Sequence, residues 1–147
     1  PLLRTKEEFE KGQPPDSIRR AQDAIRWADH LVILYPLWLG SMPALLKAFL
    51  EQVFRPGVAF EYRAQGKMAK KLFTGKSARI VVTMGMPALV YRWFFLAHSL
   101  KSLERNILAF CGIKPTRATL IGQVEGMNER QRASWLDEMR GLGDVGK

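Results

Sequence analysis

The sequence predicts an α/β domain with a parallel β-sheet, and three observations carry this prediction. Three short apolar runs, at residues 31–35, 78–84 and 116–121, lack the polar–apolar alternation of a half-exposed strand. Segments of helical length separate these runs. Hydrophobic residues make up 47% of the 147 residues, which is enough for one core. Strands that alternate with crossover helices form parallel sheets with right-handed connections.

A helix is expected before the first strand. Asp16 follows two prolines and is the predicted N-cap. Apolar residues then recur at the spacing of one helical face: Ile18, Ala21, Ile25 and Ala28. This periodicity predicts an amphipathic helix that leads into the strand at 31–35.

The strand at 31–35 is expected to be buried on both faces, because all five residues are apolar. A loop at 36–42 should follow, and Pro43 should open a second helix at its first position. Large apolar side chains occupy that helix: Leu45, Leu46, Phe49, Leu50, Val53 and Phe54. Residues 55–77 are irregular and basic, with a short extended piece expected at 58–62.

The strand at 78–84 should lead into one long helix from about Arg92 to Phe110, with Gly112 at its C-terminal cap. The third strand is expected at 116–121. Asn128 and Gln131 have the spacing of a capping box, which predicts the start of the last helix.

Most of the net charge of +9 lies in the middle of the chain. Residues 55–103 hold nine basic side chains and one acidic side chain, whereas residues 1–54 are balanced. A local basic surface suits a phosphorylated cofactor and also nucleic acid. A solvated basic loop with no specific partner would have the same composition.

Several classes of protein are excluded or disfavoured by composition. A single cysteine, Cys111, excludes an intramolecular disulfide framework, and two histidines without a cysteine cluster disfavour a zinc site, so no metal is expected. The longest apolar stretch is too short for a membrane span. The chain shows no signal-peptide pattern, and a cytoplasmic location is expected.

Two loops that follow predicted strands are candidates for a ligand site, because open α/β sheets bind ligands beyond the carboxyl ends of their strands. In the loop at 36–43, two prolines restrict the backbone, Trp38 offers an aromatic face, and Gly40 allows close approach. The loop at 83–87 adds backbone amides and a hydroxyl. This combination suits a planar heterocycle with carbonyl and imide groups, although a rigid turn around a buried tryptophan would look the same.

The segment at 35–60 resembles the flavodoxin-like NAD(P)H:quinone oxidoreductases. It reads YPLWLGSMPALLKAFLEQVF and continues to GVAF. The family has an aromatic residue, Pro-Leu, bulky residues, a small residue, a second proline and a helix ending in Val-Phe. VTMGM at 82–86 and CGI at 111–113 also resemble the family. The resemblance covers nearly the whole chain and implies a flavodoxin-like, doubly wound parallel sheet.

The resemblance implies which residues contact a flavin. The ring contacts of the family fall on two groups of residues: Pro36, Leu37, Trp38, Leu39 and Gly40 in the first loop, and Thr83, Met84, Gly85 and Met86 in the second. Tyr91 and His98 correspond to a tyrosine and a histidine that hold charge on the reduced flavin and are the expected catalytic residues. His98 stands about one residue farther from Tyr91 than in relatives. Leu39, Gly40 and Met86 depart from the residues common at their places.

The resemblance also implies that the three strands are the third, fourth and fifth of the family's sheet. Relatives hold the flavin phosphate with the loop after their first strand, and residues 1–30 contain no counterpart. The chain also begins with Pro1 instead of methionine. We therefore expect residues 1–147 to be a single flavodoxin-like domain that is incomplete at its N-terminus.

The leading hypothesis is a flavin enzyme that transfers hydride from NADH or NADPH through bound FMN or FAD to a quinone in a ping-pong reaction. FMN is favoured over FAD, because little chain follows the last helix. A homodimer is also expected, since Phe94, Phe95 and Leu96 add to apolar surface beyond the needs of one core.

Two alternatives remain at this point. Some relatives of the fold are ancillary regulatory subunits of potassium-efflux systems. A basic nucleic-acid-binding module is the other alternative, and it would use five side chains: Lys67, Lys70, Lys71, Lys76 and Arg79.

Overall fold

The computed structural model describes residues 2–63 and 69–146. Its central sheet has the strand order β1-β4-β5, formed by β1 (His30–Pro36), β4 (Ser77–Thr83) and β5 (Thr116–Ile121). Both strand pairs are parallel, and β1 and β4 pair without interruption along their whole length. The predicted parallel α/β sheet is confirmed, with strand ends that differ from the predicted ones by one residue at most.

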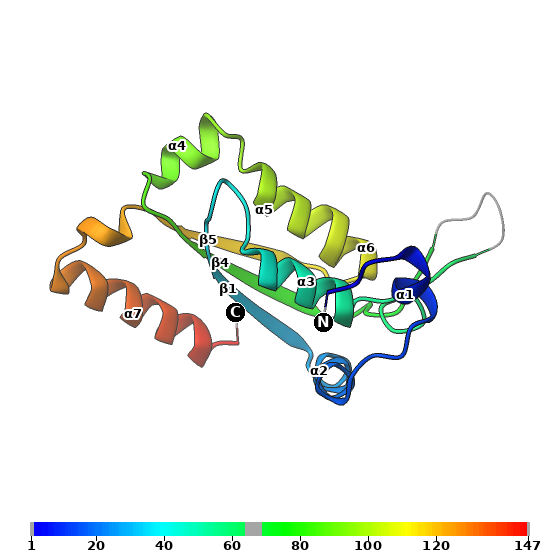
Figure 1. Cartoon of the computed structure of the whole chain (residues 1–147). Coiled ribbons are helices and arrows are strands. Elements are labelled where there is room, and N and C mark those ends of the chain that lie inside the picture. Colours follow the sequence, from blue (N-terminus) through cyan, green and yellow to red (C-terminus); the bar gives the residue numbers. More distant parts are fainter. Residues whose placement is uncertain (1, 64–68, 147) are drawn as a thin grey trace.

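Helices lie on both faces of this sheet (Figure 1). On one face lie α3 (Ala44–Val53) and the segment that ends in α6 (Ala109–Cys111), and on the other lies α7 (Glu129–Asp144). The main core lies on the α3 side, where alternate residues of β4, such as Ile80 and Val82, are fully buried. No helix in the described residues is long and apolar enough to cross a membrane.

The first strand is not buried on both faces, so that prediction is wrong for the described residues. β1 is an edge strand, since β4 is its neighbour on one side and no described strand pairs with the other. Val32 and Leu34 point away from the main core and are 67% and 66% exposed, whereas Tyr35 is 2% exposed. The apolar run therefore marks a face that the described residues cover incompletely.

The N-terminal region contains one helix that the sequence did not indicate, α1 (Lys6–Lys11), and the predicted one, α2 (Asp16–Trp27). Pro15 occupies the N-cap position of α2 and no side chain caps that end, so the prediction of Asp16 as N-cap is wrong. Asp16 instead forms an ion pair with Arg19 one turn later.

The extended piece expected at 58–62 is confirmed in part. β2 (Phe60–Glu61) pairs with β3 (Lys70–Lys71) in a short antiparallel sheet. The sequence offered no sign of this partner, because two lysines have low β-propensity. Residues 64–68, which include Lys67 of the nucleic-acid alternative, lie outside the described residues.

The single long helix expected between Arg92 and Phe110 is wrong. α4 (Ala88–Trp93) comes first, and Leu96 and Ala97 then adopt φ angles of +53° and +47°. The chain continues as α5 (His98–Ser102), the π-helical η1 (Leu103–Leu108) and α6. Neither leucine nor alanine favours the left-handed region. Their residue types therefore gave no sign of a reversal, and the apolar spacing on either side of them looked like one continuous helix. Gly112, at φ +104°, ends the segment as expected.

Two helix starts agree closely with the sequence. α3 begins at Ala44, with Pro43 in the N-cap position one residue before the predicted first turn position. α7 begins with the predicted capping box. Asn128 Oδ1 accepts from the N–H of Gln131, and Gln131 Oε1 accepts from the N–H of Asn128, both at 2.9 Å.

Candidate functional site

The two predicted loops meet at the carboxyl edge of the sheet. Pro36 lies opposite Thr83 in the register of β1 and β4, and the N–H of Leu37 donates to the carbonyl oxygen of Thr83 at 2.7 Å. The second loop is also tied to the chain after β5, because Met84 N–H donates to Ile121 O at 2.9 Å. Both loops therefore leave the sheet side by side, as the fold predicted.

The first loop is a tight turn. Trp38 and Ser41 exchange two backbone hydrogen bonds of 2.9 Å, and the two residues between them, Leu39 and Gly40, have φ angles of +48° and +77°. A two-residue turn of this hand requires positive φ at both central residues, which glycine adopts freely and leucine does not. Trp38 is 63% exposed, and Leu39 is fully exposed. The loop thus displays two large apolar side chains to solvent.

Four backbone N–H groups of the predicted site have no protein acceptor in the described part of the chain: those of Leu39, Gly40, Gly85 and Met86. Carbonyl oxygens and unprotonated ring nitrogens on the rim of a planar heterocycle accept from such N–H groups, so the two loops fit a flavin ring. The N–H groups of Leu37, Trp38 and Met84 already donate within the protein. Met84 is 3% exposed. The backbones of these three residues therefore shape the loops, while the exposed ring of Trp38 stays available to a ligand.

Gly122 is a residue of this site that sequence reasoning missed. A Cβ atom on Gly122 would lie 2.4 Å from Ala88 N and 2.8 Å from Met86 O. The chain after β5 therefore approaches the second loop so closely that only glycine fits. A glycine immediately after an expected strand is the signal that could have indicated this position.

The two residues expected to be catalytic lie in different surroundings. Tyr91 is 2% exposed, and its hydroxyl contacts Ser99 Oγ at 2.7 Å and the N–H of Leu100 at 3.2 Å. His98 is exposed at the start of α5. Within residues 2–63 and 69–146, the hydroxyl of Tyr91 bonds to Ser99 and Leu100 and not to His98.

A second buried tyrosine lies beside Tyr91. Tyr35 is 2% exposed, and its hydroxyl has no hydrogen-bond partner in the described chain. Burial raises the pKa of the Tyr35 hydroxyl, the charges of Tyr91 and Glu104 add to this effect, and the nearby Ser99 hydroxyl opposes it. The phenol is therefore neutral at any physiological pH.

A groove of about 510 Å³ opens between the first loop and the α5–η1 segment. It is lined by both apolar and hydroxyl-bearing side chains, among them Trp38, Met42, Ser99, Ser102 and Ile107. This volume is in the range of sites for small planar ligands. The groove thus places the Trp38 face opposite the residues that follow Tyr91.

A second groove, of about 610 Å³, lies between the sheet and α7. Its lining is almost wholly apolar and includes Val32, Leu34, Trp135 and Leu136. Arg79 also lines it, although it is 8% exposed; its Nη1 donates to Thr119 Oγ1 at 2.9 Å, and its Nε has no partner in the described chain. This groove contains the incompletely covered face of β1.

The basic residues of the nucleic-acid alternative do not form a free cationic surface in the described chain. Lys70 pairs with Glu61 at 3.2 Å, and Lys71 Nζ donates to Ala109 O at 3.0 Å. Lys76 Nζ donates to carbonyl oxygens in the last turn and at the C-cap of α2, those of Arg26 and Ala28, and Arg79 is buried. Phosphate binding needs accessible cations. The described members of this set instead connect parts of the fold.

Cys111 is not a reactive thiol. It is 2% exposed at the end of α6, and burial raises the pKa of its thiol to about 12, against a smaller opposing effect of Lys71. The thiolate is the nucleophilic form, and it is scarcely populated near neutral pH. Cys111 is therefore a core residue.

Comparisons with known proteins agree with this geometry. Residues 2–141 match the family described as the flavodoxin-like fold. An uncharacterised NAD(P)H oxidoreductase of Haemophilus influenzae is 27% identical over 124 residues, which cover 84% of this chain and 60% of that protein. The FMN-dependent NADH:quinone oxidoreductase 1 of Hahella chejuensis is 38% identical over 93 residues, which cover 63% of this chain and 42% of that protein.

A solved structure shows the same arrangement of elements. The crystal structure of Smu.1420 from Streptococcus mutans matches with a TM-score of 0.79 and 28% identity, over 96% of this chain and 74% of that one. The chain spans 60% and 42% of the lengths of the two relatives named above. Because the family match extends over almost the whole chain and the sheet is parallel with crossover helices, this protein belongs to the flavodoxin-like fold family.

Proposed function

We propose that the full-length protein is a flavin-dependent oxidoreductase that transfers hydride from NADH or NADPH to a quinone. The observation that carries this proposal is the junction of the two loops at Leu37 and Thr83. It brings four backbone N–H groups that have no acceptor among the described residues close to an exposed tryptophan. The names of the two relatives, an NAD(P)H oxidoreductase and an FMN-dependent NADH:quinone oxidoreductase, support it.

FMN is the cofactor that we assign to the two loops. Bound flavin supplies two-electron redox chemistry, in which nicotinamide and quinone react in turn in a ping-pong sequence. The protein binds and orients the ring with the N–H groups of Leu39, Gly40, Gly85 and Met86. Such donors also stabilise negative charge on a reduced ring. Pro36 and Pro43 restrict the backbone of the first loop, so the loop loses little conformational entropy when the ring binds.

The resemblance implies catalytic roles for Tyr91 and His98, and we assign a direct role to His98 and an indirect one to Tyr91. His98 is exposed and can approach a ligand directly. Tyr91 is buried and its hydroxyl bonds to Ser99, so Tyr91 acts through that contact.

The location that we propose for the enzyme is the cytoplasm.

Binding of the cofactor phosphate requires a structural element beyond the two loops, and the outer edge of β1 is where another strand can add to the sheet. The outer edge of β1 has no partner among the described strands, and Val32 and Leu34 are exposed beside it. An unpaired apolar edge favours the addition of another strand. We propose that a strand on this edge carries the phosphate loop, and that a helix fills the groove below α7. This proposal makes residues 1–147 an incomplete flavodoxin-like domain.

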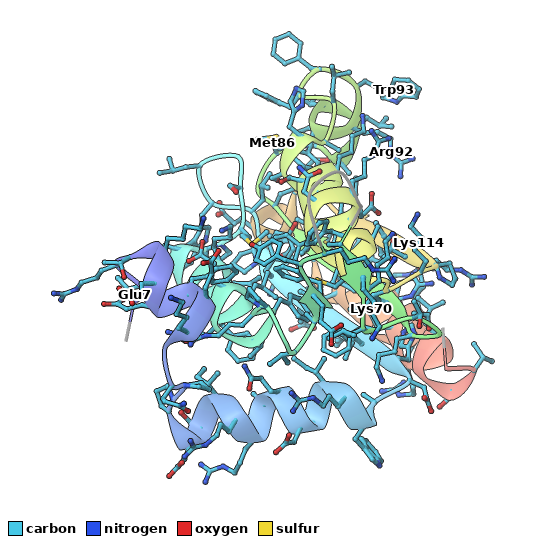
Figure 2. All side chains as sticks on the ribbon, turned by 90° about the vertical axis from the view of Figure 1, so that its right-hand side faces the viewer. Glu7, Lys70, Met86, Arg92, Trp93 and Lys114 are labelled. Atoms are coloured by element: carbon cyan, nitrogen blue, oxygen red, sulfur yellow. The ribbon has the colours of Figure 1, made fainter. Side chains whose placement is uncertain are left out.

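We also propose a homodimer in which α4 and the turn after it are buried. Trp93 and Phe94 are 72% and 78% exposed, and Leu89, Phe95 and Leu96 are also exposed. Figure 2 shows Trp93 and Arg92 projecting from the upper end of the molecule. A contiguous apolar cluster of this kind marks an interaction surface. Light scattering of the full-length protein at micromolar concentration should give a dimer mass, and a monomer mass would contradict this proposal.

The direct test of function is an absorption spectrum and a turnover assay on the full-length protein. We expect a flavin absorption band after purification and oxidation of NADH or NADPH that depends on added quinone. A colourless protein that does not bind added FMN would contradict the proposal. Salt-sensitive retention on nucleic acid by that colourless protein would instead support the basic-module alternative.

A further inference from the structure

A pair of hydroxyl groups connects the core to the groove beside the first loop. Tyr91 Oη and Ser99 Oγ are 2.7 Å apart. Tyr91 lies behind the lining of the groove and is 2% exposed, whereas Ser99 is partly exposed and lines the groove together with Trp38. Ser99 is therefore the member of the pair that a molecule in the groove can reach.

The hydrogen-bond partners indicate which hydroxyl donates. Tyr91 Oη already accepts from the N–H of Leu100 at 3.2 Å. A hydroxyl has one proton to donate and a limited capacity to accept, so donation from Tyr91 to Ser99 completes the partners of Tyr91. The buried hydroxyl of Tyr35, which lies near Ser99 and has no partner in the described chain, can donate to Ser99 as well. Ser99 then accepts from both tyrosines, and its own proton is left for a group on its open side. The open side of Ser99 is the groove, where Trp38 offers an aromatic face 63% exposed.

We propose that Ser99 donates a hydrogen bond to a carbonyl oxygen of a planar ring bound in this groove, and that Tyr91 is a positioning residue that orients Ser99. This inference rests on the proposed function, in which the flavin and the quinone both carry ring carbonyls. Sequence reasoning assigned the hydroxyl contact to Tyr91 and did not single out Ser99. The turn at Leu96 and Ala97 lies between the end of α4 and the start of α5 at His98, and it brings Ser99 to Tyr91.

The test uses four forms of the full-length protein: wild type, Ser99→Ala, Tyr91→Phe and the double variant. FMN binding is measured by quenching of flavin fluorescence. Binding of a naphthoquinone to the FMN-loaded protein is measured by quenching of tryptophan fluorescence. The titration that responds to Ser99→Ala identifies which ring accepts the hydrogen bond.

We expect Ser99→Ala to weaken one of the two titrations about 5- to 10-fold, which is the effect of one neutral hydrogen bond. Tyr91→Phe should weaken the same titration by less. The double variant should match Ser99→Ala, because a residue that acts through another adds nothing once that other is removed. Ser99→Thr keeps the hydroxyl and should retain most of the affinity. Ser134→Ala, an exposed serine on α7, is the matched control and should bind like wild type.

The outcomes separate this inference from the proposed function. Wild-type affinity for both rings in Ser99→Ala, with normal turnover, would overturn the inference and leave the function in place. A full loss in Tyr91→Phe with no effect in Ser99→Ala would assign the contact to Tyr91 and also overturn it. Loss of ring binding in Ser99→Ala, in a wild type that binds the ring but shows no turnover, would support the inference and contradict the function. A wild type that binds neither ring would overturn both.

Discussion

The backbone N–H of Leu37 donates to the carbonyl oxygen of Thr83 across 2.7 Å. This hydrogen bond extends the β1–β4 ladder by one step beyond the last paired residues, Pro36 and Thr83. It fixes the spacing between the two loops that leave the sheet at this edge. The relation depends only on the parallel register of two strands, so it is a direct consequence of the fold.

Gly122→Ala should destabilise the protein and disturb the second loop. The added Cβ would lie 2.4 Å from Ala88 N, a backbone atom that can move only with the loop. Overpacking of this kind typically costs about 1–3 kcal/mol. Urea unfolding measures the change. Gly126→Ala is the matched control, since nothing lies within 4 Å of its Cβ position. Equal stability of the two variants would contradict the close approach.

Leu39→Asn should stabilise the first loop. Leu39 is fully exposed with φ +48°, and a left-handed conformation costs a leucine about 1–2 kcal/mol, of which asparagine avoids part. We expect a gain of about 0.5–1 kcal/mol in the free energy of unfolding. Leu45→Asn, at an exposed helical position of α3, should give no gain. A loss of stability in Leu39→Asn would mean that the side chain of Leu39 is buried by another part of the full-length protein.

Tyr91→Phe should slow the reduction of bound FMN by NADPH and leave FMN bound. The variant removes only the Tyr91 hydroxyl, which bonds to Ser99, while the buried ring stays in the core. Stopped-flow absorbance at the flavin band measures the rate. Tyr62→Phe, which removes the hydroxyl of a tyrosine that is 61% exposed, is the control and should reduce at the wild-type rate. Reduction of the Tyr91→Phe protein at that same rate would refute the role assigned to Tyr91.

Cys111 should make stability fall at alkaline pH. Its pKa is about 12 in the folded protein and about 8.5 in an unfolded chain, so the folded state holds this proton more tightly. Its contribution is complete below about pH 8.5 and is lost as the pH rises towards 12. Between pH 9 and 10, wild type should lose about 1 kcal/mol more than Cys111→Ala. Urea unfolding at both pH values measures this, and parallel losses would show that the thiol is not buried.

The sheet and the meeting of the two loops followed from the sequence because they depend on local apolar runs and on one topological rule. The capping box at Asn128 was equally visible, since both partners lie in one turn. The reversal at Leu96 and Ala97 was not, because it opposes the intrinsic preference of both residues and is closed by a bond from Ala97 N–H to Tyr91 O at 3.0 Å.

The role of Ser99 and the uncovered face of β1 depend on tertiary contacts that no local pattern encodes. Ser99 matters because the chain reverses before it, and this reversal was hidden. Val32 and Leu34 have the apolar character of a doubly buried strand, but the described residues leave their face of β1 largely uncovered. The strand order separately places β1 at an edge among the described strands. In both cases the residue type can be read from the sequence, but the tertiary surroundings of the residue cannot.

Anaerobic reduction and reoxidation of the flavin in the full-length protein tests the central claim most directly. The two loops joined at Leu37 and Thr83 should bind FMN, so one equivalent of NADPH or NADH should bleach the flavin band. One equivalent of a quinone should then restore it. A protein that retains FMN but is not bleached by either nicotinamide, or is bleached and not restored by quinone, would contradict the account.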